Sequence, residues 1–225
     1  MSGVVWSRAA VHATRDVSLL VRLMADDPTS SKPRPVRRRL AQVLRALEET
    51  GARYAICGAV AMGAHGVRRF SEDLDVLVDA ADVTELLRVL GRGFREVGRE
   101  PASGPPAQVK LRARRAAGPE SVDVDVLVPV DAAEEWALTS AVRGRAFGHR
   151  LDMVSLEALV LLKLRAFVSD PESLAGAKHR ADVLALVHHP RLDVAGLRRL
   201  VCSHPPLCAE LERALAAPRP RGRHR

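Results

Sequence analysis

The sequence predicts an α+β fold, in which a mixed β-sheet flanked by helices is followed by a helical C-terminal part. Between residues 54 and 128, short apolar runs and period-two alternation are typical of strands. After about residue 154 the pattern of the sequence turns helical. The 225 residues, 47% of them hydrophobic, suffice for one large domain or for one domain with a helical appendage.

The first half of the chain predicts alternating helices and strands. Helical spacing of leucine and valine predicts a helix over 37–50, which Gly51 ends. A short buried strand over 54–57, a short helix over 59–65, a strand over 74–78 and a helix over about 81–90 follow. Residues 91–106 hold several glycines and prolines and are predicted as a loop.

The middle of the chain predicts a β-hairpin. Residues 107–114 and 122–129 each alternate apolar with polar residues, and a Gly-Pro turn separates the two runs. Successive side chains of a strand point to opposite faces, so one face of this hairpin is expected to be buried.

The C-terminal third predicts helices over 155–167, 175–188, 194–202 and 206–217. The expected organisation is a leader (1–36), an α/β core (37–154), a helical part (155–217) and a basic tail (218–225).

The net charge of +8 is concentrated in two basic runs near the ends. Lysine or arginine stands at positions 32, 34, 37, 38 and 39, and again at 219, 221, 223 and 225. Such runs suit the phosphate backbone of a nucleic acid, because neutralising phosphates releases counterions. The alternative is that they are solvated tails.

Cysteine content and hydropathy predict a cytoplasmic location. An odd number of cysteines and the lack of a secretory apolar region fit a reducing cytoplasm. No apolar run approaches the roughly 18–20 residues that cross a bilayer, so no membrane partner is expected. An aromatic content of 3% argues weakly against a base-stacking platform for single-stranded nucleic acid.

A pair of carboxylates predicts a metal site. Asp73 and Asp75 are two residues apart in a strand-like run, so both leave the same face and repel unless a cation lies between them. Hard oxygen ligands suit Mg²⁺ or Mn²⁺ that also binds substrate phosphates. Asp125, with Asp123 beside it, lies on the polar face of the later strand and can complete the cluster. The alternative is that these residues are simply solvent-facing.

A glycine upstream of the carboxylates suggests a phosphate contact. Gly58 follows the predicted buried strand and precedes the short helix, whose first N–H groups can hold a phosphate. A turn at this position would also favour glycine.

Residues 54–78 resemble the signature of the DNA polymerase β-like nucleotidyltransferase superfamily, and more narrowly its branch of AbiEii-type toxins. That pattern is an apolar strand, a Gly-Gly or Gly-Ser pair, a small helix, and then G-x-x-R-x-(T/S)-x-D-x-D. The second part is filled by Gly66, Arg69, Ser71, Asp73 and Asp75. Gly58 and Ala59 fill the first part, with alanine in place of the second Gly or Ser.

The family's third carboxylate lies in a strand of the form h-D-h-L, where h is apolar. Residues 124–127 match it, so the resemblance favours Asp125 over Asp123, whereas the shared face alone does not choose between them.

The resemblance implies a nucleotidyltransferase-type sheet and an enzyme that moves a nucleoside monophosphate from an NTP to an acceptor hydroxyl. Asp73, Asp75 and Asp125 would hold Mg²⁺ or Mn²⁺, and Asp125 would orient or deprotonate the acceptor. In toxin relatives the acceptor is tRNA and an antitoxin protein is a partner. The remaining nucleotide contacts would come from Gly58, Ala59, Arg69, Ser71, Lys163, Lys178 and Asp182.

The last three of these residues lie in the helical part. Lys163 falls on an otherwise apolar stripe, where its charge needs a phosphate, an aspartate or a route to the surface. It also begins a K-x-x-A motif like that of the AbiEii-type proteins. Lys178 and Asp182 match the family motif (R/K)-D-x-x-D, but His179 replaces the first acid. Four residues apart on a helix, they can equally form an ordinary ion pair.

Two other functions remain open. One is transfer of the nucleotide to a small molecule, such as an antibiotic hydroxyl. The other is a catalytically degenerate relative that binds nucleotide, RNA or a partner protein, which the departures at Ala59 and His179 favour.

Overall fold

The computed structural model describes residues 33–67, 73–100, 107–113, 123–146 and 148–218. The chain divides into two compact units, residues 1–154 and residues 155–225. Nowhere in these described ranges is a helix both long and apolar enough to cross a bilayer.

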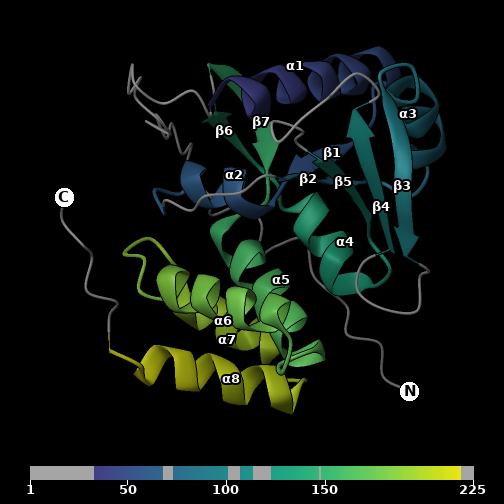
Figure 1. Cartoon of the computed structure of the whole chain (residues 1–225). Helices are drawn as coiled ribbons and strands as arrows, with labels where there is room; N and C mark the ends of the chain where they lie inside the picture. The colour runs from purple at the N-terminus through teal and green to yellow at the C-terminus, as the bar shows by residue number, and fades with distance from the viewer. Residues whose placement is uncertain (1–32, 68–72, 101–106, 114–122, 147, 219–225) are drawn as a thin grey trace. The chain divides into compact units, whose positions relative to one another are not determined.

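The N-terminal unit is built on a mixed seven-stranded sheet in the order β3-β4-β5-β2-β1-β7-β6 (Figure 1). The β2–β5 and β1–β7 pairs are parallel, and the other neighbouring pairs are antiparallel. The strands are β1 (Tyr54–Ile56), β2 (Asp73–Val78), β3 (Phe94–Glu100), β4 (Ala107–Ala113), β5 (Asp123–Val128), β6 (Val142–Ala146) and β7 (His149–Met153). The helices of this unit are α1 (Pro33–Thr50), α2 (Gly58–Ala64), α3 (Val83–Leu90) and α4 (Ala132–Thr139).

One face of this sheet carries the hydrophobic core. Alternate residues of β2 and β5, among them Leu74, Val76 and Val124, join one buried cluster with Leu40 of α1 and Leu86 of α3. Figure 1 shows α1 running along the sheet with α3 beside it. Because strand side chains alternate, the residues between these apolar positions, including the aspartates, lie on the opposite face.

The C-terminal unit is a group of four helices. They are α5 (Leu156–Ser169), α6 (Leu174–Leu186), α7 (Val194–Val201) and α8 (Pro205–Ala216). α5 is the central one, since it packs against α6, α7 and α8. Ser155, Ser173 and Asp193 cap the first three helices by accepting hydrogen bonds from backbone N–H groups. The helices predicted here are confirmed, with ends that differ by one or two residues.

The predicted α+β fold class and the hairpin strands are confirmed, but the loop predicted over 91–106 is wrong. Residues 94–100 form β3, an edge strand that pairs with β4 and shifts register between Glu96 and Gly98. From Arg95 to Arg99 every residue of β3 is exposed, so no apolar alternation marks it. α1 also begins at Pro33, four residues earlier than predicted. The two basic runs lie largely outside the described side chains.

Candidate active site

Four carboxylates occupy neighbouring positions on β2 and β5. The parallel register places Asp73 opposite Asp123 and Asp75 opposite Asp125. Adjacent strands are about 4.8 Å apart, and register partners share a face. Asp123 and Asp125 are buried, whereas Asp73 and Asp75 are half-buried. The structure therefore brings the three predicted aspartates and Asp123 together on one face.

Asp123 is engaged by an arginine of the next strand. Arg112 of β4 lies directly opposite Asp123. Its Nε and Nη2 donate hydrogen bonds to the two carboxylate oxygens of Asp123, at 2.8 and 2.7 Å. This two-point pairing is the strongest form of an arginine–carboxylate contact. Both oxygens of Asp123 are thus already used within the protein.

Asp125 is engaged on one oxygen only. Lys110 lies opposite it on β4, with Nζ 3.7 Å from Oδ2, and the Gln108 side chain donates a hydrogen bond to the carboxylate. The other oxygen, Oδ1, is buried and has no hydrogen-bond partner among the described residues. A buried oxygen of this kind is costly unless a ligand satisfies it.

The electrostatic environment of Asp125 is unfavourable to its charge. Burial, and next the negative charge of Asp75, raise the pKa of Asp125 from 3.8 to about 6, although Lys110 and Gln108 act in the opposite direction. A carboxyl group with this pKa is still ionised at neutral pH and is a stronger base than an ordinary aspartate.

Gly58 fits directly against Asp75. The backbone N–H of Cys57 donates a hydrogen bond to the Asp75 carbonyl at 3.0 Å, which ties the junction of β1 and α2 to β2. Gly58 follows with φ of +59°, and a Cβ built on it would overlap Oδ2 of Asp75. α2 starts at this residue, and Gly58 and Ala59 are both buried in its first turn. The first N–H groups of a helix have no partner within the helix, so they are potential donors beside Asp75.

The donor set fits a divalent cation shared with a substrate. Across the described ranges, no group of three or more His, Cys, Asp or Glu side chains is arranged to hold a metal ion. Mg²⁺, however, is ordinarily bound by one or two carboxylates, with substrate phosphates and water completing its shell. Asp75 and Asp125, with the unsatisfied Oδ1, match that smaller requirement.

In the C-terminal unit, Lys163 and Asp182 form a buried ion pair. Nζ of Lys163 on α5 lies 3.2 Å from Oδ2 of Asp182 on α6, and the two side chains are 11% and 6% exposed. Of the alternatives left open by the sequence, the structure shows pairing of Lys163 with an aspartate. Lys178, the other lysine that the sequence offers to Asp182, is exposed on α6.

Two predicted site residues, Arg69 and Ser71, lie outside the described residues. Conversely, sequence reasoning gave no role to Gln108, Lys110 or Arg112, which contact the β5 aspartates. The period-two pattern had placed these three on the polar face of the hairpin. Only the register of β4 against β5 shows which aspartate each one meets.

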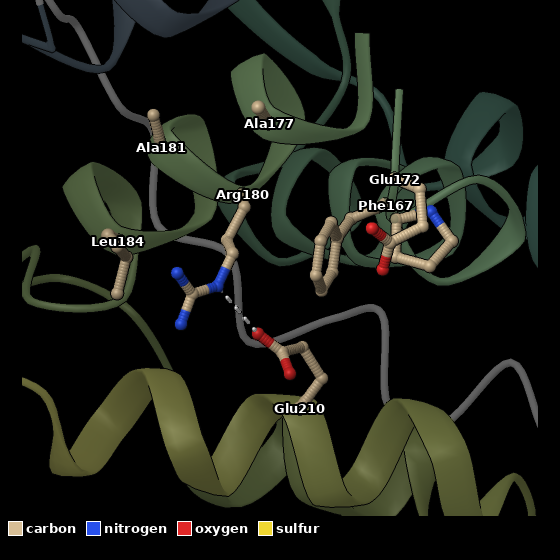
Figure 2. A pocket seen from close by; sticks show the side chains of 8 residues that line it. Phe167, Glu172, Ala177, Arg180, Ala181, Leu184 and Glu210 are labelled. Atoms are coloured by element: carbon tan, nitrogen blue, oxygen red, sulfur yellow. Dashed lines mark hydrogen bonds and ion pairs between the residues drawn. The ribbon is translucent and has the colours of Figure 1, made fainter. Parts of the chain in front are cut away.

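A separate hollow of about 520 Å³ lies within the C-terminal unit. Figure 2 shows Arg180 of α6 reaching toward the buried Glu210 of α8, beside the ring of Phe167. Arg213 also pairs with Glu210. None of the predicted site residues lines this hollow, and the arginines already neutralise its buried carboxylate.

The sequence is similar to a family of known proteins. A family model described as the nucleotidyl transferase AbiEii toxin of a type IV toxin–antitoxin system matches residues 42–205. A search of curated proteins finds no match to the sequence.

The fold is shared with a solved structure. The antibiotic-resistance factor ANT(2'')-Ia, determined in solution, is 18% identical, with 79% of this chain and 95% of that chain covered and a TM-score of 0.50. An antigenic nucleotidyltransferase-like protein from Paracoccidioides brasiliensis is also 18% identical, with 80% and 94% covered and a TM-score of 0.47. At 18% identity, the likeness to ANT(2'')-Ia shows a shared fold and nothing more.

Proposed function

Because the chain belongs to the family of AbiEii nucleotidyltransferase toxins, we propose that it moves a nucleoside monophosphate from an NTP to a hydroxyl group of RNA. We propose that the reaction depends on Mg²⁺ or Mn²⁺ and takes place at Asp73, Asp75 and Asp125. The observation that carries this proposal is the pairing of Asp75 with Asp125, whose buried Oδ1 lacks a hydrogen-bond partner among the described residues.

The chemistry is an in-line displacement at the α-phosphorus. The acceptor oxygen bonds to that phosphorus, the bond to the bridging oxygen of the β-phosphate breaks, and pyrophosphate leaves. In this proposal Asp125 orients the acceptor and takes its proton, a role that its raised pKa supports because a higher pKa makes it a stronger base. Asp73 and Asp75, together with Asp125, would hold the metal ion. When bound, the divalent cation supplies charge stabilisation for the attacking and leaving oxygens.

The remaining nucleotide contacts follow from the family motifs. The first turn of α2, at Gly58 and Ala59, offers backbone N–H groups beside Asp75. We also assign phosphate or nucleotide contacts to Arg69, Ser71, Lys163, Lys178 and Asp182. For Lys163, whose ammonium pairs with Asp182, this role requires the pair to open or to share its charge with a phosphate.

The hairpin of β6 and β7, called the basic hairpin below, supports RNA as the acceptor, and tRNA is the first candidate. Arg145 of β6 lies directly opposite Arg150 of β7, and both side chains are exposed. Like charges in directly opposed positions destabilise a hairpin unless an anion bridges them. The neighbouring Arg143, by contrast, pairs with Asp152 at 2.9 Å. Together with the net charge of +8, this favours a phosphate backbone as the ligand.

The family description also leads us to propose an antitoxin that counteracts this activity.

The direct test of the reaction supplies the purified protein with each α-labelled NTP, Mg²⁺ and total RNA, and compares it with the Asp75→Asn variant. Label in RNA with the wild type alone is the expected result. Label in an added aminoglycoside but not in RNA would show a small-molecule acceptor. If divalent metal and NTP bind but no acceptor is labelled, a degenerate relative is the better description.

A further inference from the structure

β4 presents a row of polar side chains to the carboxylates of β5. Gln108 and Lys110 contact Asp125, and Arg112 contacts Asp123. The two cations of this row are bound very differently. Arg112 makes two hydrogen bonds, at 2.8 and 2.7 Å, whereas Lys110 makes one contact at 3.7 Å. The arginine is therefore fixed by its two-point geometry, and the lysine is held mainly by charge.

Lys110 also has the freedom to move. Its side chain is 39% exposed, and an ammonium group on a flexible four-carbon stem is a compact charge that can change partners. The partner it now has, Asp125, is one that a bound divalent cation would also attract. Asp125 can thus attract either the ammonium group of Lys110, which belongs to the chain, or a divalent cation from solution.

The charges of the site make such an exchange favourable. Four aspartates against Lys110 and Arg112 leave a formal charge of −2 on this part of the sheet. A divalent cation balances that charge, so Asp125 then no longer requires the ammonium group. An NTP brings new negative charge to the same place, and its phosphates offer Lys110 a stronger partner than a neutralised carboxylate.

We infer that Lys110 is a triphosphate-binding residue, which pairs with Asp125 in this structure and transfers its ammonium group to the NTP phosphates when a divalent cation engages that carboxylate. This assignment rests on the proposed function, because it takes the β2–β5 aspartates as the metal site. Arg112 does not share the role, since both its hydrogen bonds to Asp123 would have to break.

Lys110→Met should change the affinity for Mg²⁺ and the affinity for nucleotide in opposite directions. Mg²⁺ alone should bind a few-fold more tightly than to the wild type, because a competing cation is gone. The non-hydrolysable analogue α,β-methylene-ATP, with saturating Mg²⁺, should bind about ten-fold more weakly, because one charge-assisted phosphate contact is lost. Lys110→Arg, which keeps the charge, should recover most of the nucleotide affinity.

Isothermal titration calorimetry measures both affinities without relying on turnover. Arg88→Met removes one positive charge from α3, where Arg88 pairs with Glu85, and should leave both affinities unchanged. Lys110→Gln provides a second charge-removing variant should the Met variant fold poorly. Equal weakening of both ligands, or an unchanged nucleotide affinity, would overturn the role of Lys110. If the wild type binds neither Mg²⁺ nor nucleotide, the proposed function itself fails, and the inference fails with it.

Discussion

Gly58 and Asp75 share one small space: a Cβ at residue 58 would overlap the Oδ2 atom of Asp75. The contact joins the junction of β1 and α2 to the strand that carries two of the site's carboxylates. A side chain at residue 58 would thus move the carboxylate that faces Asp125. Glycine is favoured at residue 58 for two reasons: there is no room for a Cβ beside the Asp75 carboxylate, and the backbone has a φ of +59°.

Gly58→Ala should therefore both destabilise the protein and damage the site. The positive φ alone costs about 1 kcal/mol for a residue with a Cβ, and displacing Asp75 should bring the loss of unfolding free energy to about 2–4 kcal/mol. Gly51→Ala is a matched control, because Gly51 has φ of +64° and nothing within 4 Å of the added Cβ. Urea unfolding should show only the smaller loss for Gly51→Ala, and only that variant should keep stabilisation by Mg²⁺ and NTP. Equal losses would contradict the contact.

The two β5 aspartates should respond differently to removal of their charge. Asp125→Asn should abolish the rise in Tm that Mg²⁺ and NTP produce, because ligand binding stabilises only a protein that binds it. Asp123→Asn should retain that rise, since both oxygens of Asp123 already accept hydrogen bonds from Arg112. The Asp123 variant should nevertheless have a lower Tm without ligand, because it has lost the ion pair with Arg112. Loss of the ligand response in Asp123→Asn alone would reverse the assignment.

Asp125 should make stability depend on pH. Its folded-state pKa of about 6 lies above the ordinary aspartate pKa of 3.8, so the folded protein binds more protons than the unfolded chain between these two pH values. The free energy of unfolding should fall as pH rises from about 4 through about 6, by roughly 1–3 kcal/mol in total. In EDTA, Asp125→Asn should thus be more stable than the wild type at pH 7.5, and the difference should shrink at about pH 4. A difference that does not vary with pH would argue against the raised pKa.

The buried pair in the C-terminal unit should be sensitive to loss of one partner. Lys163→Met leaves the carboxylate of Asp182 buried without its ammonium partner, which should cost about 3–5 kcal/mol of unfolding free energy. Lys163→Met combined with Asp182→Leu should recover much of that stability. If Lys163 also contacts nucleotide, the double variant should stay inactive although it is folded. Chemical denaturation and NTP-transfer assays on the same preparations separate these two roles.

The basic hairpin should contribute to RNA affinity through charge. Replacing Arg145 and Arg150 by glutamine should weaken RNA binding for all sequences and lower the slope of log K against log salt by up to about 2. Arg143, which pairs with Asp152, is the local comparison, and its replacement should have a smaller effect. Filter binding across a series of NaCl concentrations measures the slope. An unchanged slope in the double variant would remove the hairpin from the RNA-binding surface.

Much of this fold could be predicted because its signals are local. The β4 and β5 strands alternate apolar with polar residues along the chain, and the helices of the C-terminal unit are recognisable from their own apolar residues. β3 could not be predicted because it has no such pattern. Apart from Phe94, its residues with described side chains are exposed, so apolar and polar residues do not alternate along it. The spacing of Gly58, Asp73 and Asp75 is likewise a property of a short segment and could be recognised without a structure.

By itself the sequence determined that Asp123 and Asp125 leave the same face of one strand, because side-chain alternation is set by neighbouring residues. Only the tertiary structure decided that Arg112 forms an ion pair with Asp123, whereas one oxygen of Asp125 lacks a hydrogen-bond partner among the described residues. The same holds for Lys163, whose partner lies on another helix. Cross-strand register and helix packing join residues far apart in the chain, and a one-residue slip in register would change every such pairing.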